Sequence, residues 1–246
     1  MGGTTGGETR AVEYATTAEA ADPYCLSDGE AAALLAGHPW RRFAVLGDSV
    51  AEGVGDTTDG YTPMPWADRV AAELTASAPD LVYLNLGRRN LRAAAVRATQ
   101  LDEAVAFRPD LAVVACGAND ALHPGYDEAA AAAVDNEIVA MVEALRGCGA
   151  DVVTFAILVL EAYPSVGARF RPSVIARMRR LGERTTALAR RLGTIHIDLA
   201  THPVGADGDV YSSDGLHGNG RSHAVCAAGA VRALGAHLGN HFPARP

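Results

Sequence analysis

Residues 42–53 read RFAVLGDSVAEG and combine a short apolar run with a turn that carries a serine. An apolar run of this length, followed by Gly47, Asp48 and Ser49 and then by helix-forming residues, predicts a strand, a tight turn and a helix. A serine in such a turn projects from the carboxyl end of the strand. The stretch therefore predicts a sheet whose strands feed helices, with Ser49 at the rim.

The rest of the chain alternates short apolar runs with longer amphipathic stretches, as parallel strands joined by crossover helices do. We therefore predict a doubly wound, flavodoxin-like α/β/α domain with a five-stranded parallel sheet in the order 2-1-3-4-5. The predicted strands are residues 42–46, 81–86, 111–115, 152–158 and 194–199, and the predicted helices are residues 64–76, 91–106, 126–146, 172–192 and 220–238.

Two further loops at the predicted rim carry side chains that complement a serine. Asn119 follows the third predicted strand, and Asp214 and His217 follow the fifth. Taken singly, such residues are commonly turn or surface residues. Together with Ser49 they supply a nucleophile, an amide for an oxyanion, and a base held by a carboxylate. Because ligands of such sheets bind beyond the carboxyl ends of the strands, one fold brings all of these loops to one place.

Three motifs in this order resemble a known superfamily. Gly47-Asp48-Ser49, Gly117-Ala118-Asn119-Asp120 and Asp214-Gly215-Leu216-His217 closely resemble the first, third and fifth sequence blocks of the SGNH (GDSL-type) hydrolases. The resemblance implies that Ser49 is the nucleophile and donates its N–H to the oxyanion. It also implies that Asn119 donates its side-chain amide, that His217 is the base, and that Asp214 orients this base.

The second block of that superfamily is altered in this chain. The superfamily usually has a glycine five residues after an Asn and uses its N–H as an oxyanion donor, but counting from Asn85 this place is taken by Asn90. Asn90 can still present its N–H, because Asn tolerates positive φ better than most residues. Gly87, three residues earlier, is the alternative donor if the loop is shifted.

Other residues near the rim are weaker candidates. Asp48, Arg88 and Tyr163 are predicted to contact the substrate because of their positions, although a solvated surface is the commoner explanation for Arg88. No metal site is predicted, since no H-E-x-x-H or similar spacing occurs and the four cysteines form no C-x-x-C pair. No cofactor is predicted either.

Composition restricts the classes of partner. The formal net charge is −8 and all 21 basic residues are arginine, which argues against a nucleic-acid partner. No apolar run approaches the roughly 20 residues of a membrane-spanning helix, and no secretion signal is visible, so we expect no membrane partner and a cytoplasmic location. Residues 1–21 are predicted to be a flexible leader, before a single domain over residues 22–246 that begins with a short helix near residues 22–37.

These observations predict an esterase that cleaves a small-molecule carboxylic ester through an acyl-Ser49 intermediate, as a monomer or weak homo-oligomer. Two alternatives stay open. An acyltransferase in a tailoring pathway would use the same intermediate with an alcohol or amine as acceptor. A non-catalytic binding module is suggested by the missing glycine at Asn90.

Overall fold

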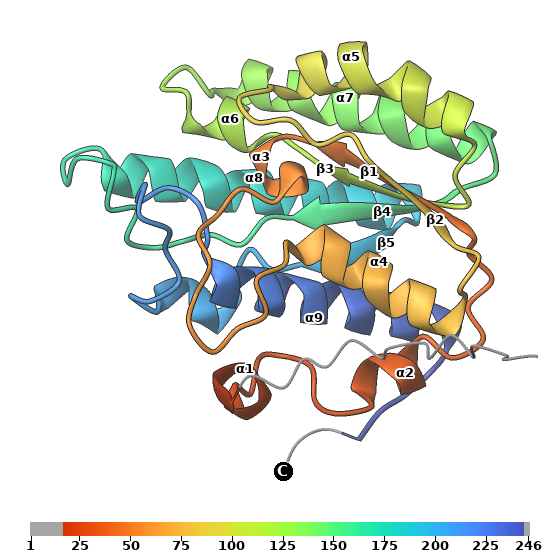
Figure 1. The fold of residues 1–246 in the computed structure, drawn as a ribbon. Coiled ribbons are helices and arrows are strands. Elements are labelled where there is room, and N and C mark those ends of the chain that lie inside the picture. The colour runs from red at the N-terminus through yellow and green to blue at the C-terminus, as the bar shows by residue number, and fades with distance from the viewer. Residues whose placement is uncertain (1–16, 244–246) are drawn as a thin grey trace, which may run out of the picture.

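The computed structural model describes residues 17–243, and at its centre is a five-stranded parallel sheet in the order β2-β1-β3-β4-β5 (Figure 1). This confirms the predicted fold class and strand order. The strands are β1 (Arg42–Gly47), β2 (Val82–Asn85), β3 (Leu111–Ala115), β4 (Asp151–Ala156) and β5 (Ile195–Asp198). Every residue of β3 is buried, as expected for a central strand that is covered on both faces.

Five long helices cover the two faces of this sheet within the described part of the chain (Figure 1). One face carries α5 (Ala93–Phe107), α7 (Glu128–Gly147) and α8 (Arg171–Leu192), and the other carries α4 (Trp66–Ser77) and α9 (Gly220–Leu238). Their ends lie within two residues of the predicted ones. No helix among residues 17–243 is long and apolar enough to cross a membrane.

Three short elements follow the carboxyl ends of the strands. They are α3 (Ser49–Glu52) after β1, α6 (Ala118–Leu122) after β3 and a 3₁₀ turn, η1 (Pro203–Ala206), after β5. The strand predicted over residues 152–158 ends earlier, at Ala156, because its partner β5 ends at Asp198. Residues 157–160 stay buried outside the sheet and form part of a cavity wall.

The N-terminal segment differs from the prediction. The helix expected near residues 22–37 is restricted to α2 (Glu30–Leu34), since the flanking Gly29 and Gly37 have left-handed φ of 74° and 69°. Thr17–Ala21, predicted as part of a flexible leader, form the helix α1, because Glu19 is buried in an ion pair. The rest of the predicted leader, residues 1–16, lies outside the described residues.

Candidate active site

The predicted nucleophile, Ser49, is the first residue of α3 and lies directly beyond the end of β1. Asp48 precedes it and caps α3, since its Oδ1 accepts the Val50 N–H at 3.0 Å. Gly47 fits where no larger residue would, because a Cβ there would lie 1.9 Å from the carbonyl oxygen of Ala115. The close approach of β1 and β3 therefore fixes the turn that presents Ser49.

Asp48 lies behind the nucleophile and has no exposed surface. Its predicted contact with a substrate is therefore corrected to a structural role. Burial raises the pKa of Asp48 to about 7, although the hydrogen bond from the N–H of Val50 acts in the opposite direction. Its Oδ2 atom has no hydrogen-bond partner among the described residues. A buried carboxyl group of this kind is least costly when it is protonated.

Gln100 supports the same turn, and the sequence analysis missed it. From α5, its Oε1 accepts the N–H of Gly47 at 2.8 Å and its Nε2 donates to the carbonyl of Gly47 at 2.9 Å. The side chain of Gln100 is buried, and its single amide bonds to both the N–H and the carbonyl of Gly47. No local pattern distinguishes Gln100 from other polar residues of α5.

The predicted acid–base pair is assembled within one turn of the chain. Nδ1 of His217 lies 2.6 Å from Oδ2 of Asp214, whose Oδ1 accepts the N–H groups of Leu216 at 2.9 Å and His217 at 3.0 Å. Burial alone would raise the pKa of Asp214, but these hydrogen bonds lower it to about 2. The carboxylate is therefore charged at neutral pH, and a proton on Nδ1 leaves Nε2 as the basic atom of His217.

A second loop holds this acid–base pair in place. The N–H of Asp56, in the loop that follows α3, donates to Ser212 Oγ at 2.8 Å, and that hydroxyl donates to the Gly218 carbonyl at 2.9 Å. The N–H of Ser213 donates in turn to Asp56 Oδ2 at 2.6 Å. The loop after Ser49 is thereby tied to both sides of the loop that carries His217.

The candidate oxyanion donors lie on two neighbouring loops. Asn119 is in α6, and its Nδ2 donates to the carbonyl of Leu91 at 2.9 Å. Asn90 adopts a left-handed φ of 68°, a conformation that glycine adopts more readily than other residues. The N–H of Gly87 donates to Asn85 Oδ1 at 2.9 Å, so it is already engaged. A Cβ on Gly87 would lie 2.2 Å from the Glu52 nitrogen, which shows that this glycine allows the loop to pack on α3.

Ser49, Asn119 and His217 line one cavity, which is partly open to the surface and has a volume of about 90 Å³. The predicted residue Tyr163 also lines it and is buried, whereas Arg88 is exposed and is not among the described residues of its wall. The remaining wall is mainly apolar, with large contributions from Trp66, Leu122, Phe155, Ile157, Leu160 and Met178. The polar groups thus stand on the wall of an otherwise hydrophobic chamber.

A second histidine, His223, lines the cavity, but none of the described carboxylates is bonded to its ring. Its Nδ1 accepts the N–H of Trp66 at 3.4 Å, and burial lowers the pKa of His223 to about 4. The ring is therefore neutral at pH 7, and His217 is the histidine equipped to hold a proton during a reaction. Within residues 17–243, no group of three or more His, Cys, Asp or Glu side chains is arranged to hold a metal ion.

The parallel sheet in the order 2-1-3-4-5, flanked by helices on both faces, is that of the SGNH hydrolase fold. The sequence model of the GDSL-like Lipase/Acylhydrolase family matches residues 45–225, and the chain belongs to this family of hydrolases. Among curated proteins, none matches the sequence significantly.

Solved structures of low sequence identity share the fold. TesA is 22% identical, with a TM-score of 0.60 over 78% of this chain and 97% of TesA. A lipase/acylhydrolase from Enterococcus faecalis is 19% identical, with a TM-score of 0.62 over 80% of this chain and 96% of its own. A catalytic mutant of Axe2, an acetylxylan esterase from Geobacillus stearothermophilus, is 14% identical, with a TM-score of 0.63 over 81% of this chain and 94% of its own.

Proposed function

We propose that the protein hydrolyses a carboxylic ester through an acyl-Ser49 intermediate. The observation that carries this proposal is that Ser49, Asn119 and His217 line one cavity while Asp214 holds the ring of His217 at 2.6 Å. A nucleophile, an amide donor and an oriented base are the groups that acyl transfer needs. Membership of a family of acylhydrolases supports the same chemistry.

In the first step, Ser49 Oγ bonds to the ester carbonyl carbon while its proton moves to Nε2 of His217. Asp214 stabilises the imidazolium that forms. When the tetrahedral intermediate collapses, the ester C–O bond breaks and His217 returns the proton to the leaving alcohol. In the second step, the oxygen of a water molecule bonds to the carbonyl carbon while His217 takes a proton from that water. The bond between this carbon and Ser49 Oγ then breaks, His217 returns the proton to Oγ, and the acid leaves.

Three donors are proposed for the oxyanion of the tetrahedral intermediate. They are the backbone N–H of Ser49, the side-chain amide of Asn119 and the backbone N–H of Asn90. Asn90 is preferred to Gly87 because the N–H of Gly87 already donates to Asn85, whereas Asn90 has the positive φ that its place in the loop requires. Preorganised donors of this kind are commonly the largest single contribution to the rate of acyl transfer.

The cavity supports a short, apolar acyl group as the part of the substrate that is buried. A cavity of about 150 Å³ lined by Leu, Ile and Phe accommodates benzene. A volume of about 90 Å³ therefore corresponds to about three or four carbon atoms. Its mainly apolar wall favours an alkyl chain over a polar group, since burying polar groups without partners is costly. We expect butanoyl esters to be better substrates than acetyl or octanoyl esters.

Hydrolysis of p-nitrophenyl esters from acetate to octanoate tests this proposal, with analysis of the acid released. Ser49→Ala should abolish turnover, whereas Ser173→Ala, on the exposed surface of α8, should leave it unchanged. Full turnover by Ser49→Ala would show that Ser49 is not the nucleophile. A preference for octanoate over butanoate would refute the acyl cavity but not the ester hydrolysis itself.

A further inference from the structure

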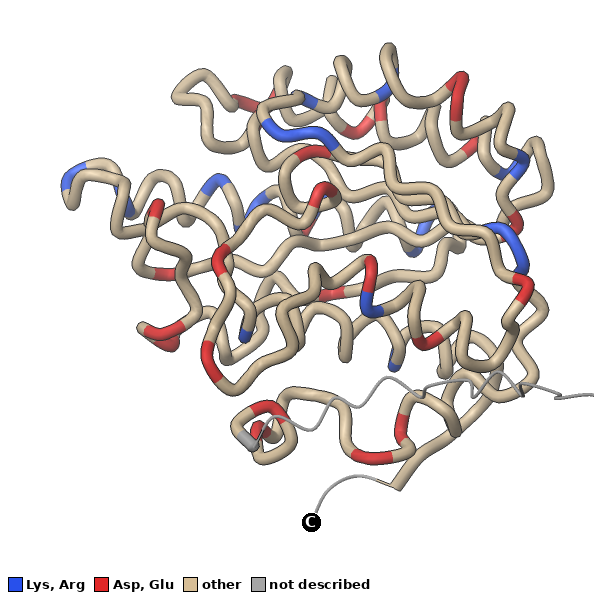
Figure 2. The backbone as a smooth tube through the Cα atoms, viewed as in Figure 1, with Lys and Arg blue, Asp and Glu red and all other residues tan. Residues whose placement is uncertain are grey.

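The N-terminal segment is acidic and precedes the part of the chain that matches the family. Residues 17–37 contain four carboxylates and no arginine (Figure 2), whereas the family match begins at residue 45. Three of these carboxylates pair with arginines of the domain: Glu19 with Arg69 at 2.5 Å, Asp22 with Arg221 at 2.7 Å, and Glu30 with Arg232 at 2.6 Å. All three carboxylates are buried, so the segment is docked rather than loosely apposed.

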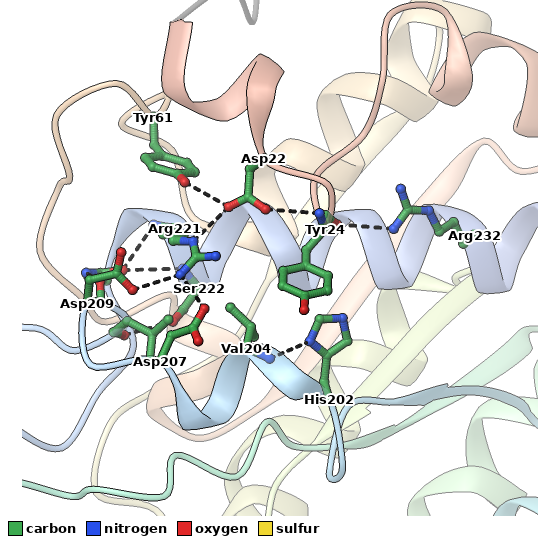
Figure 3. A network of polar contacts seen from close by, with 12 residues as sticks. Asp22, Tyr24, Tyr61, His202, Val204, Asp207, Asp209, Arg221, Ser222 and Arg232 are labelled. Carbon is green, nitrogen blue, oxygen red and sulfur yellow. Dashed lines mark hydrogen bonds and ion pairs between the residues drawn. The ribbon is translucent and has the colours of Figure 1, made fainter. Parts of the chain in front are cut away.

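The side chain of Asp22 accepts hydrogen bonds from three different residues (Figure 3). Its Oδ2 accepts the hydroxyl of Tyr61 at 2.8 Å and Nε of Arg221 at 2.7 Å, and its Oδ1 accepts the N–H of Tyr24 at 3.0 Å. The carboxylate is only 4% exposed. Burial would raise the pKa of Asp22, but these hydrogen bonds lower it below its ordinary value, so the group is charged at neutral pH.

Arg221 joins Asp22 to the loop that carries the acid–base pair. We call residues 207–219 the acid–base loop, because it contains Asp214 and His217. Nη1 of Arg221 lies 2.7 Å from a carboxylate oxygen of both Asp207 and Asp209, at the start of this loop (Figure 3). At its other end, Asn219 Oδ1 accepts the N–H of Arg221 at 3.1 Å and Nδ2 donates to the carbonyl of Asp209 at 2.6 Å. Both ends of the loop therefore meet at Arg221.

The same segment also holds the loop that follows the nucleophile. We call residues 53–65 the nucleophile loop. Glu19 accepts the N–H of Thr62 at 2.7 Å and donates its own N–H to the carbonyl of Gly60 at 2.9 Å, while Asp22 accepts the hydroxyl of Tyr61. Through Asp56 this loop reaches Ser213, next to Asp214. Asp22 thus contacts both loops, the acid–base loop through Arg221 and the nucleophile loop through Tyr61.

We propose that Asp22 is a positioning residue for the reaction, acting through Arg221 on the acid–base loop. The proposal rests on the function proposed above. With Asp22 present, Arg221 is fixed between the N-terminal segment and the loop. Without it, the guanidinium of Arg221 keeps only Asp207 and Asp209, which belong to the loop itself, and no longer ties the loop to the N-terminal segment. The loop then keeps its bonds to Asp56 and to the start of α9, and the position of His217 relative to Ser49 is less restricted.

The chain contains a matched control for this proposal. Glu30 and Arg232 form a second ion pair between the same segment and the same helix, α9, in which Glu30 is buried and the side chain of Arg232 is 39% exposed. Arg232 lies 11 residues, or about 16 Å, farther along α9 than Arg221. The contacts of Arg232 are with Glu30 and the carbonyls of Tyr24 and Cys25, away from the acid–base loop. Loss of Glu30 should therefore cost stability without disturbing His217.

The test compares Asp22→Asn with Glu30→Gln in the full chain by steady-state kinetics on p-nitrophenyl butanoate, thermal unfolding and amide hydrogen exchange. For Asp22→Asn we expect kcat to fall at least about tenfold, since small displacements of catalytic groups are costly, with KM little changed. Exchange in residues 207–218 should become faster. Glu30→Gln should lower the melting temperature to a similar degree while leaving kcat and that exchange unchanged. Tyr61→Phe, which removes only one donor to Asp22, should show a smaller effect of the same kind and serves if Asp22→Asn does not fold.

The proposal is overturned if both variants alter kcat equally, or if exchange in residues 207–218 is the same in Asp22→Asn as in Glu30→Gln. Wild-type protein without esterase activity would refute the proposed function alone. The exchange measurement would still decide whether Asp22 orders the acid–base loop, because it does not depend on turnover.

Discussion

The side-chain amide of Asn119 donates to the backbone carbonyl of Leu91, with Nδ2 and the oxygen 2.9 Å apart. Leu91 directly follows Asn90, so this bond fixes the turn in which Asn90 adopts its left-handed conformation. A primary amide has two N–H groups, which leaves one for an oxyanion in the cavity. The side chain of Asn119 therefore fixes the positions of two proposed oxyanion donors, its own amide and the N–H of Asn90, relative to each other.

Asn119→Ala should lower kcat by about 10²–10³, as the loss of one oxyanion donor does elsewhere, with little change in KM. Asn136→Ala, on the exposed side of α7, is the matched control and should leave both constants unchanged. Steady-state kinetics on a butanoyl ester measures this. If Asn119→Ala raised KM and left kcat unchanged, Asn119 would bind the ground state as strongly as the transition state and would not act on the oxyanion specifically.

Substitutions of Asn90 can show whether its backbone N–H or its side chain is the functional group. Asn90→Gly keeps the N–H and favours positive φ, so kcat should stay within about threefold of wild type. Asn90→Val keeps the N–H but disfavours this conformation, because a β-branched residue rarely adopts positive φ, and it should lower kcat strongly. If Asn90→Gly lost as much activity as Asn90→Val, the side chain rather than the backbone would be the functional group.

Gln100→Leu should destabilise the domain by about 2 kcal/mol, since it leaves the N–H of Gly47 buried without a partner. The carbonyl of Gly47 keeps only the N–H of Arg88, at 3.2 Å. Because Gly47 precedes the nucleophile turn, kcat should fall as well. Chemical denaturation and kinetics on the same samples measure both effects. Thr99→Ala, at the exposed neighbouring position of α5, should change neither. Unaltered stability in Gln100→Leu would show that the turn does not depend on this amide.

The raised pKa of Asp48 predicts that the stability of the protein depends on pH. Its folded pKa of about 7 lies above the ordinary value of 3.8. The folded state therefore holds a proton that the unfolded state releases, and the wild type loses stability as pH rises from about 4 to about 7. Asp48→Asn removes this titration, so its melting temperature relative to wild type should increase between pH 4 and pH 8. A constant or decreasing difference would mean that Asp48 is ionised in the folded protein.

The sequence was sufficient for those parts of the site that depend on local pattern. Apolar runs followed by turn residues predicted the strands, and parallel strand order then placed Ser49, Asn119 and His217 at one rim. The pairing of Asp214 with His217 also depends on a single turn of chain, which is why a spacing of three residues was informative.

The parts that were missed depend on contacts between distant segments. Gln100 lies 53 residues from Gly47, and its role follows only from the packing of α5 on β1. The helix Thr17–Ala21 was assigned to a flexible leader because its composition is polar, but the buried pair of Glu19 with Arg69 compensates for that polarity. Asp48 was expected at the substrate because the turn is at the rim, yet its side chain points into the protein and is fully buried.

Labelling with a fluorophosphonate, followed by mass spectrometry of the intact protein and its peptides, shows whether Ser49 is a nucleophile activated by His217. We predict a single adduct on Ser49 in the folded wild type, none in Ser49→Ala, and much slower labelling in His217→Ala. An adduct on another residue, or hydrolysis of esters by folded protein whose Ser49 does not react, would contradict the account.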